Sequence, residues 1–274
     1  MTLQILLTND DGIHAPGLAV LRRAVDGLGE VSTIAPDHNA SGVARGITIG
    51  RPLHLRPATY GDGWTGLACD GTPADCVRVG LVGRRCPAPG LVIAGVNDGA
   101  NMGADITYSG TVGAAFEAAL RGFPALAFSV ESESPGWLDE AVPVIRGLVE
   151  LVIARGLPRQ SVLNVNLPDR PLVEFAGIRP ARLGGASCHD RVFIGRDGAG
   201  PDGDGEAPGA GDAESVDEVF VPCEHPTSGG WADTDFDVVG RGYVAVTPLH
   251  YDLLDLELLA TLADWGLGLE HVRV

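Results

Sequence analysis

The chain has 274 residues, of which 45 % are apolar, and its 36 acidic and 19 basic residues give a formal net charge of −17. This composition supports a packed core and excludes global disorder, and no apolar run approaches the ~20 residues that span a bilayer. All 19 basic residues are arginines, and so acidic a surface repels nucleic-acid polymers and anionic membranes, which we therefore exclude as partners.

The chain begins without the basic segment of a signal peptide, so we expect a cytoplasmic protein. Its cysteines are odd in number and follow no metal-binding spacing, which favours buried, reduced thiols. They are Cys69, Cys76, Cys86, Cys188 and Cys223.

The first 165 residues alternate apolar, β-branched runs with helical patterns. Strands are predicted over residues 3–8, 31–35, 91–96, 125–130 and 162–165. Helices are predicted over residues 16–28, 73–82, 111–121 and 138–155. Near-continuous apolar strands that alternate with helices indicate an α/β fold with a parallel sheet covered on both faces.

The second part of the chain differs. Strands are predicted over residues 178–183, 219–222 and 243–249, and a helix over 254–265. The last strands have no obvious partner in a sheet completed by the first 165 residues. The tract 196–218 holds eight acidic residues after Arg196 and no basic one, which predicts a mobile surface loop. We expect one domain over 1–274, with a core (1–168) and a β-rich extension (169–274).

The segment Thr8-Asn9-Asp10-Asp11-Gly12 directly follows the first predicted strand. In open α/β sheets, ligands bind outside the carboxyl ends of the strands. Two adjacent carboxylates at that position can hold a hard cation. The alternative is a turn with two solvated acids.

Two further loops follow predicted parallel strands. One contains Asn39 and Ser41. The other contains Asn97 and Asn101, and it leads through Ser109-Gly110-Thr111 into a helix. Small hydroxyl residues and glycine at a helix N-terminus form an anion site, although Ser109 or Thr111 could simply cap the helix.

The three loops together carry oxygen donors and almost no histidine. Oxygen ligation selects Mg²⁺, Mn²⁺ or Ca²⁺ over Zn²⁺. A divalent ion beside a helix N-terminus suits phosphoryl chemistry, because the ion activates water and neutralises developing charge.

Five segments in order, TNDDG, APDHNASG, GTPADCV, AGVNDGANMG and YSGTVGAA, resemble the SurE (stationary-phase survival protein) family of 5′/3′-nucleotidases. LNVNLPD (163–169) and GYVAVTPLHYDL (242–253) extend the resemblance to nearly the whole chain. It implies a Rossmann-like core and metal-dependent hydrolysis of nucleoside 5′- and 3′-monophosphates, with short polyphosphates as a side activity in some members.

The resemblance also implies roles for individual residues. The metal ligands are Asp10, Asp11, Ser41 and Asn97, holding one Mg²⁺ or Mn²⁺ per subunit. The phosphate contacts are Ser109, Gly110 and Thr111, with Asn39 and Asn101 close by. For catalysis, Asp10 and Asp11 hold the metal that activates water. Asp11 is the best-placed carboxylate to take the proton of that water, and Asn9 can orient the water.

Family members form dimers or tetramers by exchanging C-terminal segments, so a homodimer or homotetramer is expected. The tract 196–218 and the region 178–191 depart from the family pattern, which affects substrate range and assembly. Two alternatives stay open. One is a non-catalytic nucleotide sensor, which the retention of all four ligands disfavours. The other is an enzyme that trims polyphosphate.

Overall fold

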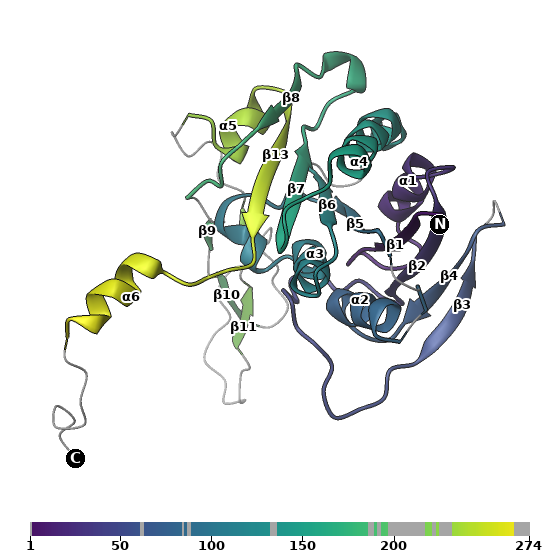
Figure 1. Ribbon diagram of the computed structural model, residues 1–274, viewed down its shortest axis with the longest axis horizontal. Helices are drawn as coiled ribbons and strands as arrows, with labels where there is room; N and C mark the ends of the chain where they lie inside the picture. The colour runs from purple at the N-terminus through teal and green to yellow at the C-terminus, as the bar shows by residue number, and fades with distance from the viewer. Residues whose placement is uncertain are drawn as a thin grey trace.

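A mixed nine-stranded sheet in the order β3-β4-β2-β1-β5-β6-β7-β13-β8 dominates the computed structural model (Figure 1). The structure describes residues 2–60, 63–83, 85–86, 89–131, 136–185, 189–190, 193–196, 217–220, 223–224 and 232–265. The strands of the large sheet are β1 Gln4–Thr8, β2 Glu30–Pro36, β3 Leu55–Thr59, β4 Thr65–Cys69, β5 Leu91–Asp98, β6 Ala125–Val130, β7 Ser161–Leu167, β8 Gly177–Pro180 and β13 Tyr243–His250.

Helices cover both faces of this sheet. The α-helices are α1 Pro16–Ala24, α2 Pro73–Leu81, α3 Gly110–Leu120, α4 Val142–Arg155, α5 Asp235–Gly240 and α6 Leu256–Ala263. Three 3-10 helices are η1 Gly103–Thr107, η2 Leu138–Ala141 and η3 Leu172–Glu174. In the described parts of the chain, no helix combines the length and the apolar character needed to cross a membrane.

The first strand shows how the sequence builds two cores. Ile5 and Leu7 pack with residues of α1 and α4 on one face of the sheet. Leu6 packs with residues of α2 and α3 on the other face. Successive side chains of a strand point to opposite faces, so an uninterrupted apolar run such as this one belongs to a strand buried on both sides.

The parallel part of the sheet runs β4-β2-β1-β5-β6-β7, and the direction of winding reverses between β1 and β5. At such a reversal the loops after two adjacent strands diverge to opposite faces and leave a crevice between them. The loops that follow β1 and β5 are those that carry Asp10, Asp11 and Asn97. The predicted parallel, helix-covered core is therefore confirmed.

The edge hairpin formed by β3 and β4 was not predicted. Its segments, LRPAT and TGLAC, contain proline, glycine and small residues, and β3 is largely exposed. Among the described strands, β3 pairs only with β4, and proline is tolerated in such edge strands because a ladder N–H can be spared there. The predicted helix over 138–155 is also divided, into η2 and α4, with Pro143 in the first turn of α4.

The expectation that the last strands lack a partner in the sheet is wrong. β13 pairs antiparallel with β7 along six residues, from Ala245 opposite Asn166 to His250 opposite Ser161, and β8 pairs with β13. One edge of β7 pairs with β6, and the C-terminal part of the same chain pairs with the other edge. The extension thereby becomes part of the main sheet.

Two short hairpin pairs lie in the extension. β10 Phe193–Arg196 pairs with β11 Asp217–Phe220, so that Arg196 lies opposite Asp217. β9 His189–Asp190 pairs with β12 Cys223–Glu224. The predicted strand over 219–222 agrees with β11 as far as Phe220. Of the predicted acidic loop, residues 197–216 lie outside the described part of the chain.

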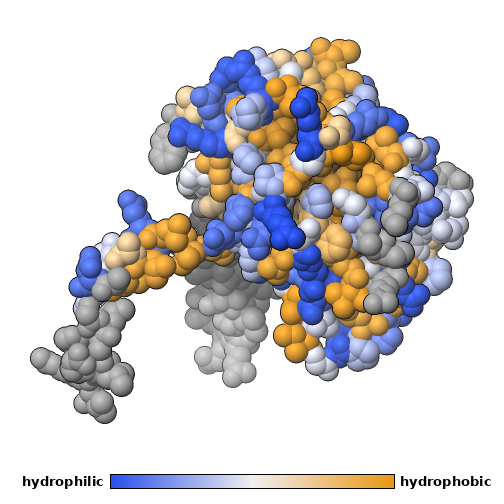
Figure 2. Space-filling view, in the orientation of Figure 1, coloured by the Kyte–Doolittle hydropathy of each residue, from blue (hydrophilic) through white to orange (hydrophobic). Residues whose placement is uncertain are grey.

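The helix α6 stands clear of the body of the molecule (Figure 1). Figure 2 shows apolar residues along it. Its flanking Leu253 is 91 % exposed, and Leu256 within it is 70 % exposed. A helix with so much exposed leucine buries little of its apolar surface against its own chain.

Candidate functional site at the carboxyl ends of β1, β2 and β5

Three loops that the sequence singled out meet at one edge of the sheet. The N–H of Ala40, in the loop after β2, donates to the carbonyl of Asp10 at 2.7 Å. The N–H of Asp98, at the end of β5, donates to Oδ2 of Asp11 at 3.1 Å. The candidate metal ligands are thus on neighbouring loops at the reversal point of the sheet.

Asp10 is buried and is fixed by the first turn of α3. The N–H of Thr111 donates to its Oδ2 at 3.0 Å, and the Thr111 hydroxyl donates to its Oδ1. A Cβ at Gly110 would lie 2.8 Å from Asp10 Oδ2, so glycine is required for this approach. Burial raises the pKa of Asp10, and the bonds from Thr111 oppose this rise.

Asp11 lies at the mouth of the site and is half-buried. Its pKa is raised to about 7, first by burial and then by the neighbouring Asp10 and Asp98 carboxylates. The negative charges of these carboxylates repel one another, and a cation bound at Asp10 and Asp11 would relieve that repulsion.

The loop after β2 places Asn39 and Ser41 on the surface beside Asp10. Oδ1 of Asn39 accepts from the N–H of Ser41 at 2.8 Å and from its hydroxyl at 2.6 Å. This local turn orders the loop, and both side chains are exposed to an incoming ligand.

The end of β5 contains an irregularity that positions Asn97. Ala94 lies opposite Ala127 and Asn97 opposite Ser129, so β5 has one more residue than β6 in this stretch. Such a bulge redirects the side chains that follow it. The Nδ2 of Asn97 donates to the carbonyl of Gly99 at 2.7 Å, so Oδ1 is the atom of this side chain that could bind a cation.

Ser109 and Asn101, both predicted to contact phosphate, have structural contacts here. Ser109 is the N-cap of α3, where its hydroxyl oxygen accepts from the N–H of Val112 at 3.1 Å. Its hydroxyl hydrogen remains able to donate to a ligand. The Nδ2 of Asn101 donates to the hydroxyl of Ser129 at 2.8 Å.

Asn9 is fully buried below the aspartates. Its Nδ2 donates to the carbonyl of Gly12 at 2.9 Å, which closes the turn after β1. Its Oδ1 has no hydrogen-bond partner within the part of the chain that the structure describes. A buried acceptor without a partner costs free energy, which a bound water or ligand would recover.

Sequence reasoning missed the residues that hold the loop after β5. The side chains of Asn164 and Asn166 both donate to the carbonyl of Asn101, at 2.8 and 2.9 Å. Asp235, at the start of α5, accepts from the N–H of Gly103 at 2.8 Å. The alternate asparagines of LNVNLPD, which interrupt an apolar strand, were the signal that could have indicated the first two.

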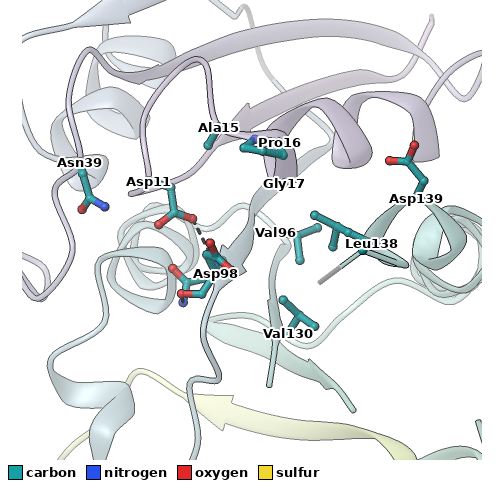
Figure 3. Close-up of a pocket in the computed structure, with 12 residues that line it drawn as sticks. Asp11, Ala15, Pro16, Gly17, Asn39, Val96, Asp98, Val130, Leu138 and Asp139 are labelled. Atoms are coloured by element: carbon teal, nitrogen blue, oxygen red, sulfur yellow. Dashed lines mark hydrogen bonds between the residues drawn. The ribbon is translucent and has the colours of Figure 1, made fainter. Parts of the chain in front are cut away.

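A pocket of about 550 Å³ opens beside Asp11 (Figure 3). Its polar side contains Asp11, Asn39, Asn97 and Asp98. Its other side contains Ala15, Pro16, Gly17, Val96, Val130 and Leu138, with Asp139 at the rim. The volume suits a small molecule.

The donor set of the site consists of oxygen atoms. Within the described parts, no three His, Cys, Asp or Glu side chains gather to hold a metal. A cation here would therefore need the neutral oxygens of Ser41 and Asn97 beside the carboxylates of Asp10 and Asp11. Such a set of oxygen ligands fits Mg²⁺ or Mn²⁺ and does not fit Zn²⁺.

Comparison with known proteins gives consistent matches. The family described as "Survival protein SurE" matches residues 5–190. A protein of Rubrobacter xylanophilus named 5'-nucleotidase SurE is 39 % identical over 280 residues, covering 99 % of this chain and 100 % of the relative. A protein of Pseudomonas putida with the same name is 40 % identical, covering 97 % and 100 %. The crystal structure of a SurE protein from Aquifex aeolicus superposes with a TM-score of 0.77 at 35 % identity, covering 95 % and 98 %.

Proposed function

This chain belongs to the SurE family, and on that premise we propose that it is a hydrolase that removes the phosphate from nucleoside 5′-monophosphates. The observation that supports this most directly is the meeting of Asp10, Asp11 and the Asn97 loop beside the N-terminus of α3. That arrangement combines a cation site with the positive end of a helix, and a phosphate group needs both.

The residues present fit a divalent ion. The mutual repulsion of Asp10, Asp11 and Asp98, which contributes to the raised pKa of Asp11, would fall when a cation binds. Asp10 and Asp11 would hold Mg²⁺ or Mn²⁺ with Ser41 and Asn97. The ion would supply charge neutralisation at the phosphate and a lowered pKa for water.

The protein groups then position the reactants. Thr111 holds the carboxylate of Asp10 in one orientation, and Ser109 and Gly110 at the start of α3 offer donors to the phosphate oxygens. Asn39 and Asn101 lie on the adjoining loops. Asn9, with its unpartnered buried Oδ1, orients the attacking water.

The reaction is a displacement at phosphorus. The oxygen of water bonds to phosphorus as the bond from phosphorus to the sugar oxygen breaks. Asp11 accepts one proton of the water and then releases it to solvent, and the departing sugar oxygen takes up one proton from solvent, so that the nucleoside leaves with a hydroxyl and Asp11 is regenerated. The same groups recognise the phosphate, whichever sugar oxygen carries it, so we extend the proposed activity to 3′-monophosphates.

The acting form is a homo-oligomer in this proposal. Exposed leucines on α6, a helix that stands clear of its own chain, support exchange of the C-terminal segment with a second subunit. The pairing of β13 within its own chain limits that exchange to the residues after His250 and to the hairpins.

A phosphate-release screen over nucleoside 5′- and 3′-monophosphates, with and without added Mg²⁺ or Mn²⁺, tests the proposal. We expect release that depends on the metal and that a chelator abolishes. Asp11→Asn should lose most of kcat, whereas the matched surface change Asp26→Asn should retain it. Full turnover by metal-free protein, or by folded Asp11→Asn, would contradict the proposed site.

A further inference from the structure

The loop that joins β5 to α3 carries Asn101 and ends at Ser109, two candidate contacts of the phosphate group. On one side β7 holds this loop, because the side chain of Asn166 bonds to both the N–H and the carbonyl of Asn101. On the other side the loop is held by α5, through a contact between Gly103 and Asp235. Two elements that come much later in the sequence therefore fix its position.

Asp235 takes the place of a helix cap that the loop itself lacks. The 3-10 helix η1 begins at Gly103, and Met102 before it offers no side chain as an N-terminal cap. Oδ2 of Asp235 accepts the N–H of Gly103 at 2.8 Å instead. The first N–H groups of a helix have no partner within the helix, so a carboxylate from outside fixes the point at which η1 begins. Because η1 ends shortly before Ser109, its start also sets the position of that residue.

Apolar contacts hold the same two segments together. Met102, directly before η1, belongs to a small buried cluster with Phe236, Val238 and Val239 of α5. Burial of apolar surface has no preferred direction, so this cluster brings α5 against the loop without fixing its exact placement. A hydrogen bond does have a preferred direction. The bond from Gly103 to Asp235 therefore decides how the loop lies on α5.

The second oxygen of Asp235 binds the segment that follows β8. Oδ1 accepts from the N–H of Gly184 at 2.9 Å. A Cβ at Gly184 would lie 2.9 Å from this oxygen, so glycine is required for the approach. The N–H of Asp235 in turn donates to the carbonyl of Arg182 at 2.9 Å. One residue thus joins the loop after β5, the start of α5 and the segment after β8.

The carboxylate of Asp235 is fully buried. Among the described residues, its partners are backbone N–H groups, those of Gly103, Gly184 and Phe236. Burial raises its pKa, and these bonds oppose the rise. Burying a carboxylate costs free energy, but its hydrogen bonds are short and hold their donors in a defined geometry. Asp235 is therefore suited to fixing the relative positions of backbone segments.

We propose that Asp235 is a positioning residue of the site, which sets through Gly103 where Asn101 and Ser109 meet the phosphate group. The inference rests on the proposed function for the phosphate group. It goes beyond that function by assigning a role to a residue of the C-terminal part of the chain that does not line the pocket beside Asp11. Asp235 acts through the backbone of the loop and touches neither the metal nor the phosphate.

The test measures the Kd of inorganic phosphate with excess Mn²⁺ by calorimetry, and the KM of adenosine 5′-monophosphate. Asp235→Ala removes the acceptor of the Gly103 N–H. We expect both constants to rise roughly tenfold, because a displacement of about 1 Å in a positioned group can cost up to roughly 100-fold. Neither constant depends on the fraction of protein that is active, so partial unfolding cannot cause these shifts. The Kd of Mn²⁺ should stay unchanged, because Asp10 and Asp11 lie on another loop.

A second variant displaces Asp235 without changing any atom of the loop after β5. In Gly184→Ala the new Cβ would lie 2.9 Å from Oδ1 of Asp235 and 2.7 Å from a ring carbon of Phe236. The Kd of phosphate should rise in this variant too, by less than in Asp235→Ala. The matched control is Asp237→Ala, which removes a carboxylate of the same helix that pairs with Arg241. It should leave both constants as in wild type.

The outcomes separate this inference from the proposed function. A folded Asp235→Ala protein that binds phosphate with the Kd of wild type would overturn the inference, and so would equal shifts in Asp235→Ala and Asp237→Ala. If Asp235→Ala does not fold, an unchanged Kd in Gly184→Ala would overturn it. A wild-type protein that binds phosphate with Mn²⁺ but hydrolyses no monophosphate would overturn the proposed function alone, because the shifts in Kd would still report on Asp235. A wild-type protein that binds no phosphate would overturn both.

Discussion

Thr111 donates both its backbone N–H and its hydroxyl to the carboxylate of Asp10, one to each oxygen. The first turn of α3 thus holds a carboxylate of the protein itself where a free phosphate could otherwise bind. Thr111 acts on the site chiefly through Asp10. The backbone N–H of Gly110 also bonds to that carboxylate, so a phosphate at this turn would share it, and the Ser109 hydroxyl is the donor not committed to Asp10.

The first prediction concerns this contact. Thr111→Val keeps the shape of the side chain but removes the hydroxyl donor to a buried carboxylate oxygen. We expect a loss of about 1–3 kcal/mol in unfolding free energy and a weaker affinity for Mn²⁺. Chemical denaturation and metal titration measure the two effects. Thr107→Val, at an exposed position of η1, is the control, and a Thr111→Val protein that matches it in both measurements would refute the assigned role.

The second prediction uses two aspartates of α5 whose pKa values are shifted in opposite directions. Burial raises the pKa of Asp235 above 3.8, whereas hydrogen bonds, first from the N–H of Asp233, lower that of Asp237. A raised pKa means that the native state binds the proton more tightly, so Asp235 favours folding increasingly as the pH falls towards 3.8. Asp237 favours folding above pH 3.8, and its contribution declines as the pH falls below that value.

The measurement is the melting temperature of each Asp→Asn variant against that of wild type, from pH 7 to pH 3. The advantage of wild type over Asp235→Asn should grow as the pH falls, and its advantage over Asp237→Asn should shrink. Curves that run in the same direction for both variants would contradict the assignment of buried and exposed carboxylates.

The third prediction concerns assembly. Light scattering at micromolar concentration should show a dimer or tetramer, because the leucines of α6 need a surface to cover them. The double variant Leu256→Glu and Leu259→Glu should shift the protein towards monomer. Val173→Glu, at a side chain that is 90 % exposed on η3, is the control. A compact, active wild-type monomer would refute the exchange of C-terminal segments.

The fourth prediction concerns the acidic tract. The backbone of Arg196 pairs with that of Asp217 and brings the two ends of the tract together. A short linker can therefore replace the residues between them. Eight acidic residues brought over an anionic substrate would repel it, so a role as a lid is disfavoured. Replacing residues 198–216 with a Gly/Ser linker should leave kcat/KM for monophosphates nearly unchanged. A large fall in kcat with the fold and oligomer intact would establish the lid.

The sequence allowed the parallel core and the three loops to be predicted because both depend on local patterns. Apolar runs such as the one through Leu6 identify buried strands, and Asp10 and Asp11 directly follow one of them. The contact between Thr111 and Asp10 joins residues 101 positions apart. Such contacts depend on how α3 packs on the sheet, and no spacing in the sequence encodes them.

The same limit explains the remaining errors. β3 and β4 are edge strands of small and polar residues, which lack the apolar alternation of a buried strand. The pairing of β13 with β7 is decided by which edge of the sheet is left open, and that is known only once the sheet is assembled. In the sequence, Asp235 is one of several acidic residues in its segment. Its contact with the N–H of Gly103 exists only in the folded structure, where Asp235 is buried.

The position of β13 between β7 and β8 also constrains the order in which the chain can fold during synthesis. Of the strands that the structure describes, β13 is the only neighbour of β8 in the sheet, yet the ribosome makes Pro180 well before Tyr243. At about 5–20 residues synthesised per second, the nascent chain spends several seconds with one edge of β7 unpaired and with β8 lacking its partner strand. An unpaired edge is a template for strands of other chains. Nascent chains stalled before residue 243 should therefore be the form of this protein most dependent on chaperones.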